Sequence, residues 1–126
     1  EDTSTRPVIF VAFGAGFAPV KSLIQHSMSL DLAESMDLHW LAERAGHYQD
    51  NLCRSWADAL DNFSYVPHEH ASDVETAVAG IVAGYPDLHR FDVYAAGTAE
   101  QLQIARRLFL EHGLPEQRWH ACAMEM

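Results

Sequence analysis

An unbroken apolar run that passes directly into two glycines constrains the fold of this chain more than any other feature. Residues Val8–Phe13 are all apolar, Gly14 and Gly16 follow, and Pro19 then begins a segment with apolar residues at helical spacing. A continuous apolar run of this length is typical of a strand that is buried on both faces. The stretch therefore predicts a buried strand, a glycine turn and a helix, in that order.

Segments with the character of strands and of helices alternate along the rest of the chain. The capping-box patterns Ser72-Asp73-Val74-Glu75 and Thr98-Ala99-Glu100-Gln101 mark the starts of two helices, the second running to Glu111. Such alternation implies βαβ units around a parallel sheet, so we predict a doubly wound α/β domain. The predicted strands are 8–13, 36–42, 63–66 (closed by Pro67), 91–95 and 119–122, and the other two predicted helices are 19–29 and 50–60.

Composition and charge exclude several classes of protein. The chain has 126 residues, of which 48% are hydrophobic and 21% charged, which fits one globular domain. The polar residues 1–7 are expected to form a linker or tail before a domain at 8–126. A net charge of -10 argues against nucleic-acid binding, since that affinity depends on lysine and arginine. No apolar stretch is long enough to span a membrane.

The cysteines indicate the compartment. Cys53 and Cys122 are far apart and form no CxxC pattern. They are expected to be reduced thiols, which favours a cytoplasmic protein.

The glycine turn after the first strand has a chemical meaning as well as a structural one. Glycine has no Cβ, so the backbone can approach a ligand closely. The helix that follows offers free N–H groups and the positive end of its dipole, which suits a pyrophosphate. However, the pattern is GxGxxP rather than the GxGxxG of the dinucleotide fingerprint. A tight turn without a ligand is the alternative explanation of the two glycines alone.

The whole segment Gly14-Ala15-Gly16-Phe17-Ala18-Pro19-Val20-Lys21-Ser22-Leu23 resembles the GTGFAPIKSL-type segment in the nucleotide-binding domain of the ferredoxin reductase superfamily. The resemblance covers nearly the whole chain. The chain is similar to the bacterial reductases that carry electrons from NAD(P)H through FAD to a [2Fe-2S] centre. Those reductases supply electrons to oxygenases or to sugar deoxygenation. Further segments that resemble this family are Arg6-Pro7, Leu38-His39-Trp40, Tyr48, Leu52–Trp56, Phe63–Pro67, Asp92-Val93-Tyr94 and Ala105–Pro115.

The resemblance implies a five-stranded sheet in the order 3-2-1-4-5 and a nicotinamide dinucleotide, NAD(P)H, as ligand. The residues after the second strand, Glu43 and Arg44, would meet the adenosine ribose, and Tyr48 the adenine. A carboxylate favours the free 2′-hydroxyl of NAD, whereas an arginine can accept the 2′-phosphate of NADP. NAD is favoured, and both remain open. Two further groups of contacts are implied: Gly14, Ala15, Gly16, Phe17, Ala18 and Pro19 at the pyrophosphate and ribose, and Gly97 and Thr98 near the nicotinamide.

The chain departs from the family at the point where hydride leaves the nicotinamide. These reductases usually read Cys-Gly-Pro-Pro after the fourth strand, and here Ala96 stands in the place of the cysteine. Hydride transfer depends on close alignment of donor and acceptor, so a lost positioning group lowers its rate. No catalytic residue is assigned for this reason.

The family holds FAD mainly in a separate β-barrel domain, and the [2Fe-2S] cluster in a further domain or protein. Neither an Arg-x-Tyr-Ser flavin motif nor a four-cysteine cluster occurs in this sequence. We therefore expect these residues to be one half of a longer reductase that cannot complete a redox cycle alone. Its expected partners are the flavin-binding domain, in the same full-length chain, and a [2Fe-2S] domain or protein.

Two hypotheses compete with the reductase domain. A degenerate domain would keep the fold and the ligand but would have lost hydride transfer, and a docking scaffold would use Gly14 and Gly16 for packing only. Two histidines, His68 and His70, alternate around Glu69 and could chelate a metal. No further ligand occurs at a recognisable spacing, so a surface loop is favoured and no metal site is predicted.

Overall fold

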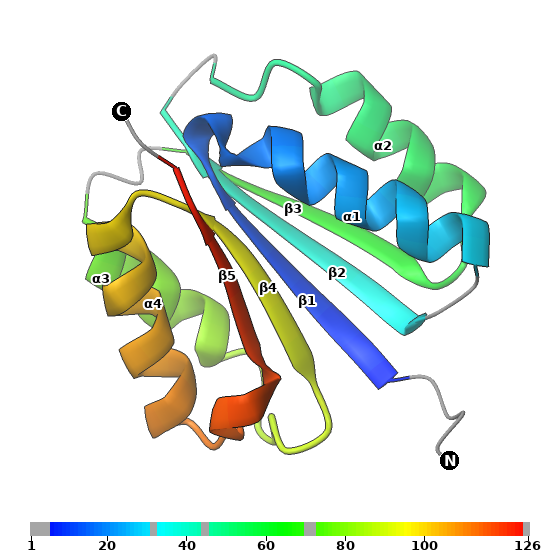
Figure 1. Cartoon of the computed structure of the whole chain (residues 1–126). Coiled ribbons are helices and arrows are strands. Elements are labelled where there is room, and N and C mark those ends of the chain that lie inside the picture. The colour runs from blue at the N-terminus through cyan, green and yellow to red at the C-terminus, as the bar shows by residue number, and fades with distance from the viewer. Residues whose placement is uncertain (1–5, 31–32, 44–45, 70–72, 125–126) are drawn as a thin grey trace.

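The computed structural model describes residues 6–30, 33–43, 46–69 and 73–124. These residues form a five-stranded parallel sheet in the order β3-β2-β1-β4-β5 with helices on both faces (Figure 1). The doubly wound α/β fold and its strand order are thereby confirmed. The strands are β1 (Arg6–Phe13), β2 (Ala33–Ala42), β3 (Phe63–Glu69), β4 (Asp92–Gly97) and β5 (Trp119–Ala123), and the helices are α1 (Phe17–Leu30), α2 (Asp50–Ala59), α3 (Val74–Val82) and α4 (Ala99–Glu111), with short 3₁₀ turns η1 (Gly14–Gly16) and η2 (Glu116–Arg118).

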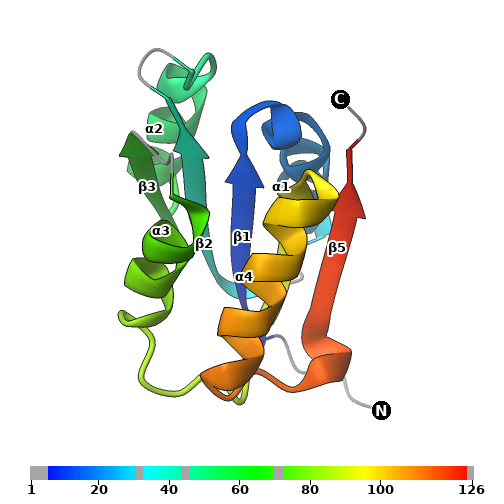
Figure 2. The same ribbon diagram turned by 90° about the vertical axis from the view of Figure 1, so that its left-hand side faces the viewer.

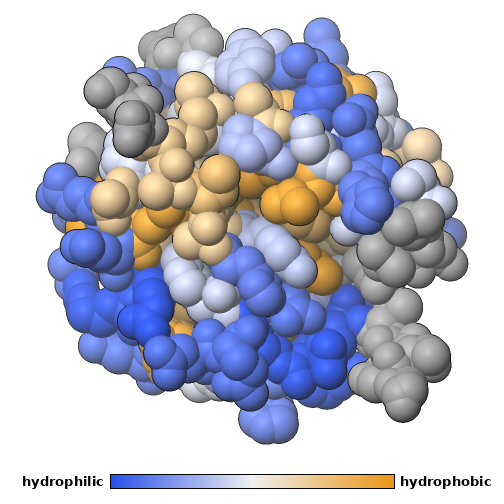
Figure 3. Space-filling view, viewed as in Figure 1, coloured by the Kyte–Doolittle hydropathy of each residue, from blue (hydrophilic) through white to orange (hydrophobic). Residues whose placement is uncertain are grey.

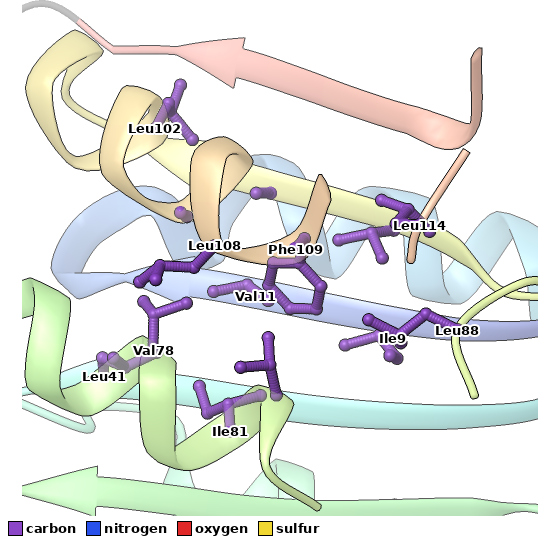
Figure 4. Close-up of a cluster of buried hydrophobic side chains, with 14 of the residues drawn as sticks. Ile9, Val11, Leu41, Val78, Ile81, Leu88, Leu102, Leu108, Phe109 and Leu114 are labelled. Atoms are coloured by element: carbon purple, nitrogen blue, oxygen red, sulfur yellow. The ribbon is translucent and has the colours of Figure 1, made fainter. Parts of the chain in front are cut away.

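The central strand β1 separates two hydrophobic cores. Side chains alternate between the faces of a strand, and every residue from Val8 to Phe13 is buried. Ile9 and Val11 pack into the core beneath α3 and α4 (Figure 4), while Phe10 and Ala12 pack into the core beneath α1 and α2. The prediction of a strand buried on both faces is confirmed.

Each pair of helices covers one face of the sheet. Figure 2, turned by 90°, places α3 and α4 in front of the strands and α1 and α2 behind them. Val78 and Ile81 of α3 meet Phe109 of α4 in the first core. Phe17 and Ile24 of α1 lie in the second core, whose fully buried members include the large aromatic side chain of Trp40.

All five strands extend beyond their predicted bounds: β2 begins at Ala33 rather than at 36, β4 ends at Gly97 rather than at 95, and β5 ends at Ala123 rather than at 122. The other two extensions involve proline. β1 begins at Arg6 rather than Val8, with an irregularity in its pairing between Arg6 and Pro7, so Pro7 occupies the strand's end where a missing donor is tolerated. β3 was expected to stop before Pro67, but it pairs with β2 as far as Glu69. β3 is an edge strand. A proline is tolerated on an edge strand where the N–H that it lacks would have pointed to solvent rather than to the neighbouring strand.

The helix starts were predicted with mixed success. α4 begins with the expected capping box: the Thr98 hydroxyl accepts from the Gln101 N–H, and the Gln101 side chain accepts from the Thr98 N–H. α3 is capped one residue later than expected, because the Asp73 side chain accepts from the Thr76 N–H. Ser72, the predicted cap, lies outside the described residues. α1 starts at Phe17, two residues before Pro19, which still lies in the first turn where helix N–H groups lack internal partners.

Parallel strands end at one common edge, so the loops that follow them lie together. β1 pairs directly with β4, and η1 and α4 therefore begin side by side at the carboxyl edge. In such sheets this is the position where ligands bind. None of the helices in the described part of the chain has the length and hydrophobicity needed to span a lipid bilayer.

Candidate functional site

The glycine turn between β1 and α1 has a conformation that its first residue makes possible. Gly14 has a φ of 57°, in the left-handed region that glycine enters without the steric penalty of a Cβ. The turn from Gly14 to Gly16 leads straight into α1, whose first turn carries no acidic side chain. The positive end of the α1 dipole therefore remains uncompensated at the carboxyl edge of the sheet.

Two stacked aromatic side chains, Trp40 and Phe17, support the turn. Trp40 of β2 donates from Nε1 to the carbonyl oxygen of Gly14 over 2.9 Å. Its ring is stacked on that of Phe17, with centroids 4.1 Å apart and planes 10° from parallel. Phe17 was predicted to contact the ligand, but its side chain is fully buried, so only its backbone is available for that purpose.

Gly16 has a packing role of its own. A Cβ at this position would lie 2.3 Å from the carbonyl oxygen of Ala96 in β4. The turn can approach β4 this closely only because Gly16 has no side chain. Consequently, Gly16 by itself is not a sign of a ligand, and the turn needs other support for that role.

The second predicted contact region, Gly97 and Thr98, lies against the turn. A Cβ on Gly97 would stand 2.8 Å from Cδ2 of Phe13 and 2.7 Å from Oε1 of Gln101, so this position is also closely packed. Thr98 caps α4, which places a second helix N-terminus at the same edge. The Gly97 carbonyl accepts from the N–H of Met124, which brings the end of the described chain to the site.

A small pocket of about 140 Å³ lies between these two helix starts. It brings together the predicted residues Gly14, Ala15 and Gly16 with Gly97 and Thr98, which are far apart in the sequence. Ala15 and Ala18 are exposed, while Pro19 is half-buried. Three residues that line the pocket were not predicted from the sequence to contact a ligand: Phe13, Gln101 and Met124. Gln101 could have been found, because its place in the capping box fixes it beside Thr98.

The loop after β2 carries the predicted adenosine contacts. The N–H of Gly46 donates to the Glu43 carbonyl over 2.8 Å, and Nε2 of His47 lies 2.8 Å from the carbonyl oxygen of Trp40. Tyr48 is 58% exposed and meets the ring of Trp40 edge-on, with centroids 5.2 Å apart. The predicted adenosine contacts Glu43 and Tyr48 therefore flank the aromatic support of the turn, and Arg44 lies outside the described residues.

A shallow apolar hollow lies beside the pocket, between α1 and β5. Ala96 is buried at its floor and pairs in register with the exposed Cys122 of β5. The hollow measures about 90 Å³, and the ring of His120 in its wall is stacked on Tyr94 at a centroid distance of 4.5 Å. Figure 3 shows hydrophobic side chains gathered near the centre of this face. Leu23, which lines the hollow, is 38% exposed.

His68 does not lie in the surface loop that was expected. It belongs to β3 and is half-buried, and its Nε2 is 3.0 Å from Nδ1 of His39. His70 is outside the described residues. Within the part of the chain that the structure describes, no group of three or more His, Cys, Asp or Glu side chains is arranged to hold a metal ion.

Several known proteins with similar sequences are named reductases. The chain is 31% identical over 123 residues to the CDP-6-deoxy-L-threo-D-glycero-4-hexulose-3-dehydrase reductase of Yersinia pestis, covering 93% of this chain and 37% of that protein. It is 30% identical to terephthalate 1,2-dioxygenase reductase component 1 of a Comamonas species, with the same coverage of 93% and 37%. The chain thus spans a little over a third of the length of these relatives. No model of a known protein family matches it.

Solved structures share the fold. The cytochrome P450 reductase GcoB of Amycolatopsis superposes with a TM-score of 0.82 at 16% identity, over 98% of this chain and 38% of that one. Phthalate dioxygenase reductase, described as a modular structure for electron transfer from pyridine nucleotides to [2Fe-2S], gives a TM-score of 0.67 at 18% identity, over 98% and 37%. At such identities the likeness concerns the fold.

Proposed function

Because the chain belongs, by sequence and by fold, to the ferredoxin–NAD(P) reductase superfamily, we propose that it is the NAD(P)H-binding domain of a flavin-dependent reductase. The observation that carries the proposal is the pocket where the η1 turn and the start of α4 converge. Two helix N-termini meet there, and backbone N–H groups and helix dipoles together favour a pyrophosphate. The absence of acidic side chains from the first turn of α1 supports the same ligand.

The remaining parts of the dinucleotide can be assigned by extension from this pocket. Adenine would lie against the exposed ring of Tyr48, and Glu43 would meet the adenosine ribose. A carboxylate suits the 2′-hydroxyl of NADH better than a 2′-phosphate, so NADH is the proposed preference. The nicotinamide would lie next to Gly97 and Thr98, on the side of the pocket that is nearer to Ala96.

FAD is proposed to be held mainly by a neighbouring domain of the longer protein, where it would accept hydride and pass electrons to a [2Fe-2S] centre. The apolar hollow between α1 and β5 is the proposed contact for that domain, because it lies beside Ala96 and exposes Leu23 and Cys122. This chain's part is to bind and orient the dinucleotide. It would not complete a redox cycle without that domain. We also propose a cytoplasmic location, in keeping with two free thiols.

A second candidate function is a degenerate domain that binds the dinucleotide without hydride transfer. Ala96 favours this candidate, since it offers no polarizable sulfur to the nicotinamide. Reconstitution with the flavin domain of the full-length protein separates the two: reduction of FAD by NADH supports the reductase, whereas binding without reduction supports the degenerate domain.

Calorimetric titration with NADH and NADPH in parallel tests the proposed binding. Ala15→Glu places a carboxylate in the pocket next to the N-terminus of α1, where a negative charge is favourable for the helix. We expect it to weaken NADH binding by about tenfold or more without loss of stability. Gln25→Glu adds the same charge on an exposed position of α1 and is the matched control. Equal affinities of the two variants would overturn the proposed site.

A further inference from the structure

A groove on the opposite face of the molecule is unrelated to the candidate site. It has a volume of about 440 Å³ and runs between α3 and the strands β2 and β3. Val78 of α3 joins the core with Ile9 of β1 and Leu41 of β2. Toward the edge of the sheet, the exposed residues Ser64 and Val66 of β3 face the groove. The groove is lined by Asp37, His39, Ser64, Val66, His68, Gly80, Ile81, Gly84 and Tyr85.

Glycine in α3 keeps the groove open. A Cβ on Gly80 would meet no atom within 4 Å, so the space beside this helix is empty. Glycine lowers helix stability relative to alanine by about 1 kcal/mol, and nothing in the packing requires it here.

Four polar side chains along the groove form one continuous chain of hydrogen bonds. The Tyr85 hydroxyl donates to Oδ2 of Asp37 over 2.8 Å and lies 2.8 Å from Nε2 of His39. Nδ1 of His39 lies in turn 3.0 Å from Nε2 of His68. The chain crosses from the end of α3 through β2 to the edge strand β3.

The direction of every bond follows from the carboxylate. Burial and the charge of Asp37 raise the pKa of Tyr85, so its hydroxyl keeps its proton and donates it to Asp37. The Tyr85 oxygen must then accept from Nε2–H of His39. Burial lowers the pKa of His39 to about 4, so His39 is neutral and its Nδ1 carries a lone pair.

The same reasoning fixes the last member of the chain. Nδ1 of His39 can only accept, so His68 donates from Nε2–H. Burial and the charge of His47 also lower the pKa of His68, which is therefore neutral with a lone pair on Nδ1. The two ends of the chain are thus acceptors: the carboxylate of Asp37 and Nδ1 of His68.

Asp37 has no counter-ion among the described residues. Its hydrogen-bond partner there is a neutral phenol, and no Lys, Arg or His in the described ranges forms an ion pair with it. A partly buried carboxylate is stabilised by a nearby positive charge. Ser64, exposed on the same face of β3, adds an oxygen that can accept.

The walls of the groove suit an alkyl stem. Val66 is 38% exposed on β3, and Ile81 lines the opposite side from α3. Long cationic side chains bury their methylene groups against such surfaces while their charged end makes polar contacts.

We propose that the groove binds a guanidinium or ammonium group carried on an alkyl chain. The cation lies at Asp37 and donates hydrogen bonds to the acceptors of the groove, and the stem packs between Val66 and Ile81. Such a group has two sources, an arginine or lysine side chain of a partner protein and a free alkylamine.

Titration of the whole chain, observed by amide chemical shifts in NMR, tests this site. N-Acetyl-argininamide represents the side chain of a protein, agmatine represents a free amine, and N-acetyl-citrullinamide is the neutral control of nearly the same shape. We expect both cations to shift the amides of Ser64, His68, Gly80 and Gly84 at millimolar concentration, and the citrulline compound to shift them far less. The cation with the higher affinity identifies the source.

Two variants make the test specific. Asp37→Asn keeps an oxygen that can accept from Tyr85 and removes the charge, so we expect affinity to fall by about tenfold or more. Asp58→Asn removes a charge from an exposed position of α2, on the other face, and leaves the affinity unchanged. Gly80→Leu fills the groove and abolishes binding while α3 is stabilised. The proposal is wrong if the citrulline compound binds equally well, or if Asp37→Asn and Gly80→Leu retain the shifts.

Discussion

Gly16 and Ala96 approach each other so closely that a Cβ on Gly16 would lie 2.3 Å from the Ala96 carbonyl oxygen. This contact holds the turn after β1 against β4, beside the candidate pocket. It predicts that Gly16→Ala destabilises the fold by about 1–3 kcal/mol, because the backbone of β4 cannot yield as a flexible side chain would.

Urea unfolding measures this change, with Gly80→Ala as the matched control. A Cβ at Gly80 meets nothing within 4 Å, so that variant should gain up to about 1 kcal/mol in helix stability. Unchanged stability of Gly16→Ala would show that β4 and the turn can move apart.

The hydrogen bond from Trp40 to the Gly14 carbonyl yields a second prediction. Trp40→Phe keeps an aromatic ring over Phe17 but leaves the carbonyl without its donor, so stability should fall by roughly 1 kcal/mol or more. NADH affinity should fall as well, since the turn loses its anchor. Trp119→Phe is the control, because the ring of Trp119 lies against Phe109 in the other core. Equal NADH affinity in both variants would contradict this role of Trp40.

Acid should weaken the fold through His39. Burial, followed by the charge of His68, lowers the pKa of His39 from 6.5 to about 4. Between these values the unfolded chain binds more protons than the folded one, so the stability is present above pH 6.5 and is lost as the pH falls toward 4. The loss should be on the order of 1–3 kcal/mol.

The free energy of unfolding, measured by urea titration across this pH range, checks the prediction. His39→Gln cannot titrate, so its stability should be lower at neutral pH and less dependent on pH between these limits. A wild-type profile parallel to that of His39→Gln would show that His39 is not the group responsible.

The two thiols should differ sharply in reactivity. Cys53 is fully buried in α2, and burial raises its pKa to about 12, so its thiolate is scarce and inaccessible. Cys122 is exposed on β5. Iodoacetamide should therefore alkylate Cys122 alone in the folded protein and both cysteines in denaturant, as read by peptide mass spectrometry. Rapid labelling of Cys53 without denaturant would mean that α2 opens readily.

The sequence predicted the architecture well because local signals agreed with the final packing. The apolar run Val8–Phe13 is typical of a strand buried on both faces, and the Thr98 capping box marks the start of α4. Strand ends were less predictable. Pro67 looked like a terminator, but its position at the edge of the sheet, which a sequence does not reveal, allows β3 to continue to Glu69.

The candidate site was predictable in its glycines and not in its distant members. Gly14 follows β1 and Gly97 is the last residue of β4, and because these two strands pair, the two glycines meet at the same edge of the sheet. Met124, directly after β5, is held at the pocket by its hydrogen bond to Gly97. No pattern in the sequence indicates this contact. The chain of hydrogen bonds from Asp37 to His68 was also invisible, since it joins three elements through side-chain geometry.

We propose that NAD(P)H binds where the turn after β1 meets the start of α4. Amide chemical shifts recorded during titration with NADH locate the bound dinucleotide, because each residue reports separately. We expect the largest shifts at Gly14, Ala15, Gly16, Gly97 and Thr98, with a second group at Tyr48. An absence of shifts at these residues at millimolar NADH and NADPH, or shifts confined to another part of the chain, would contradict it.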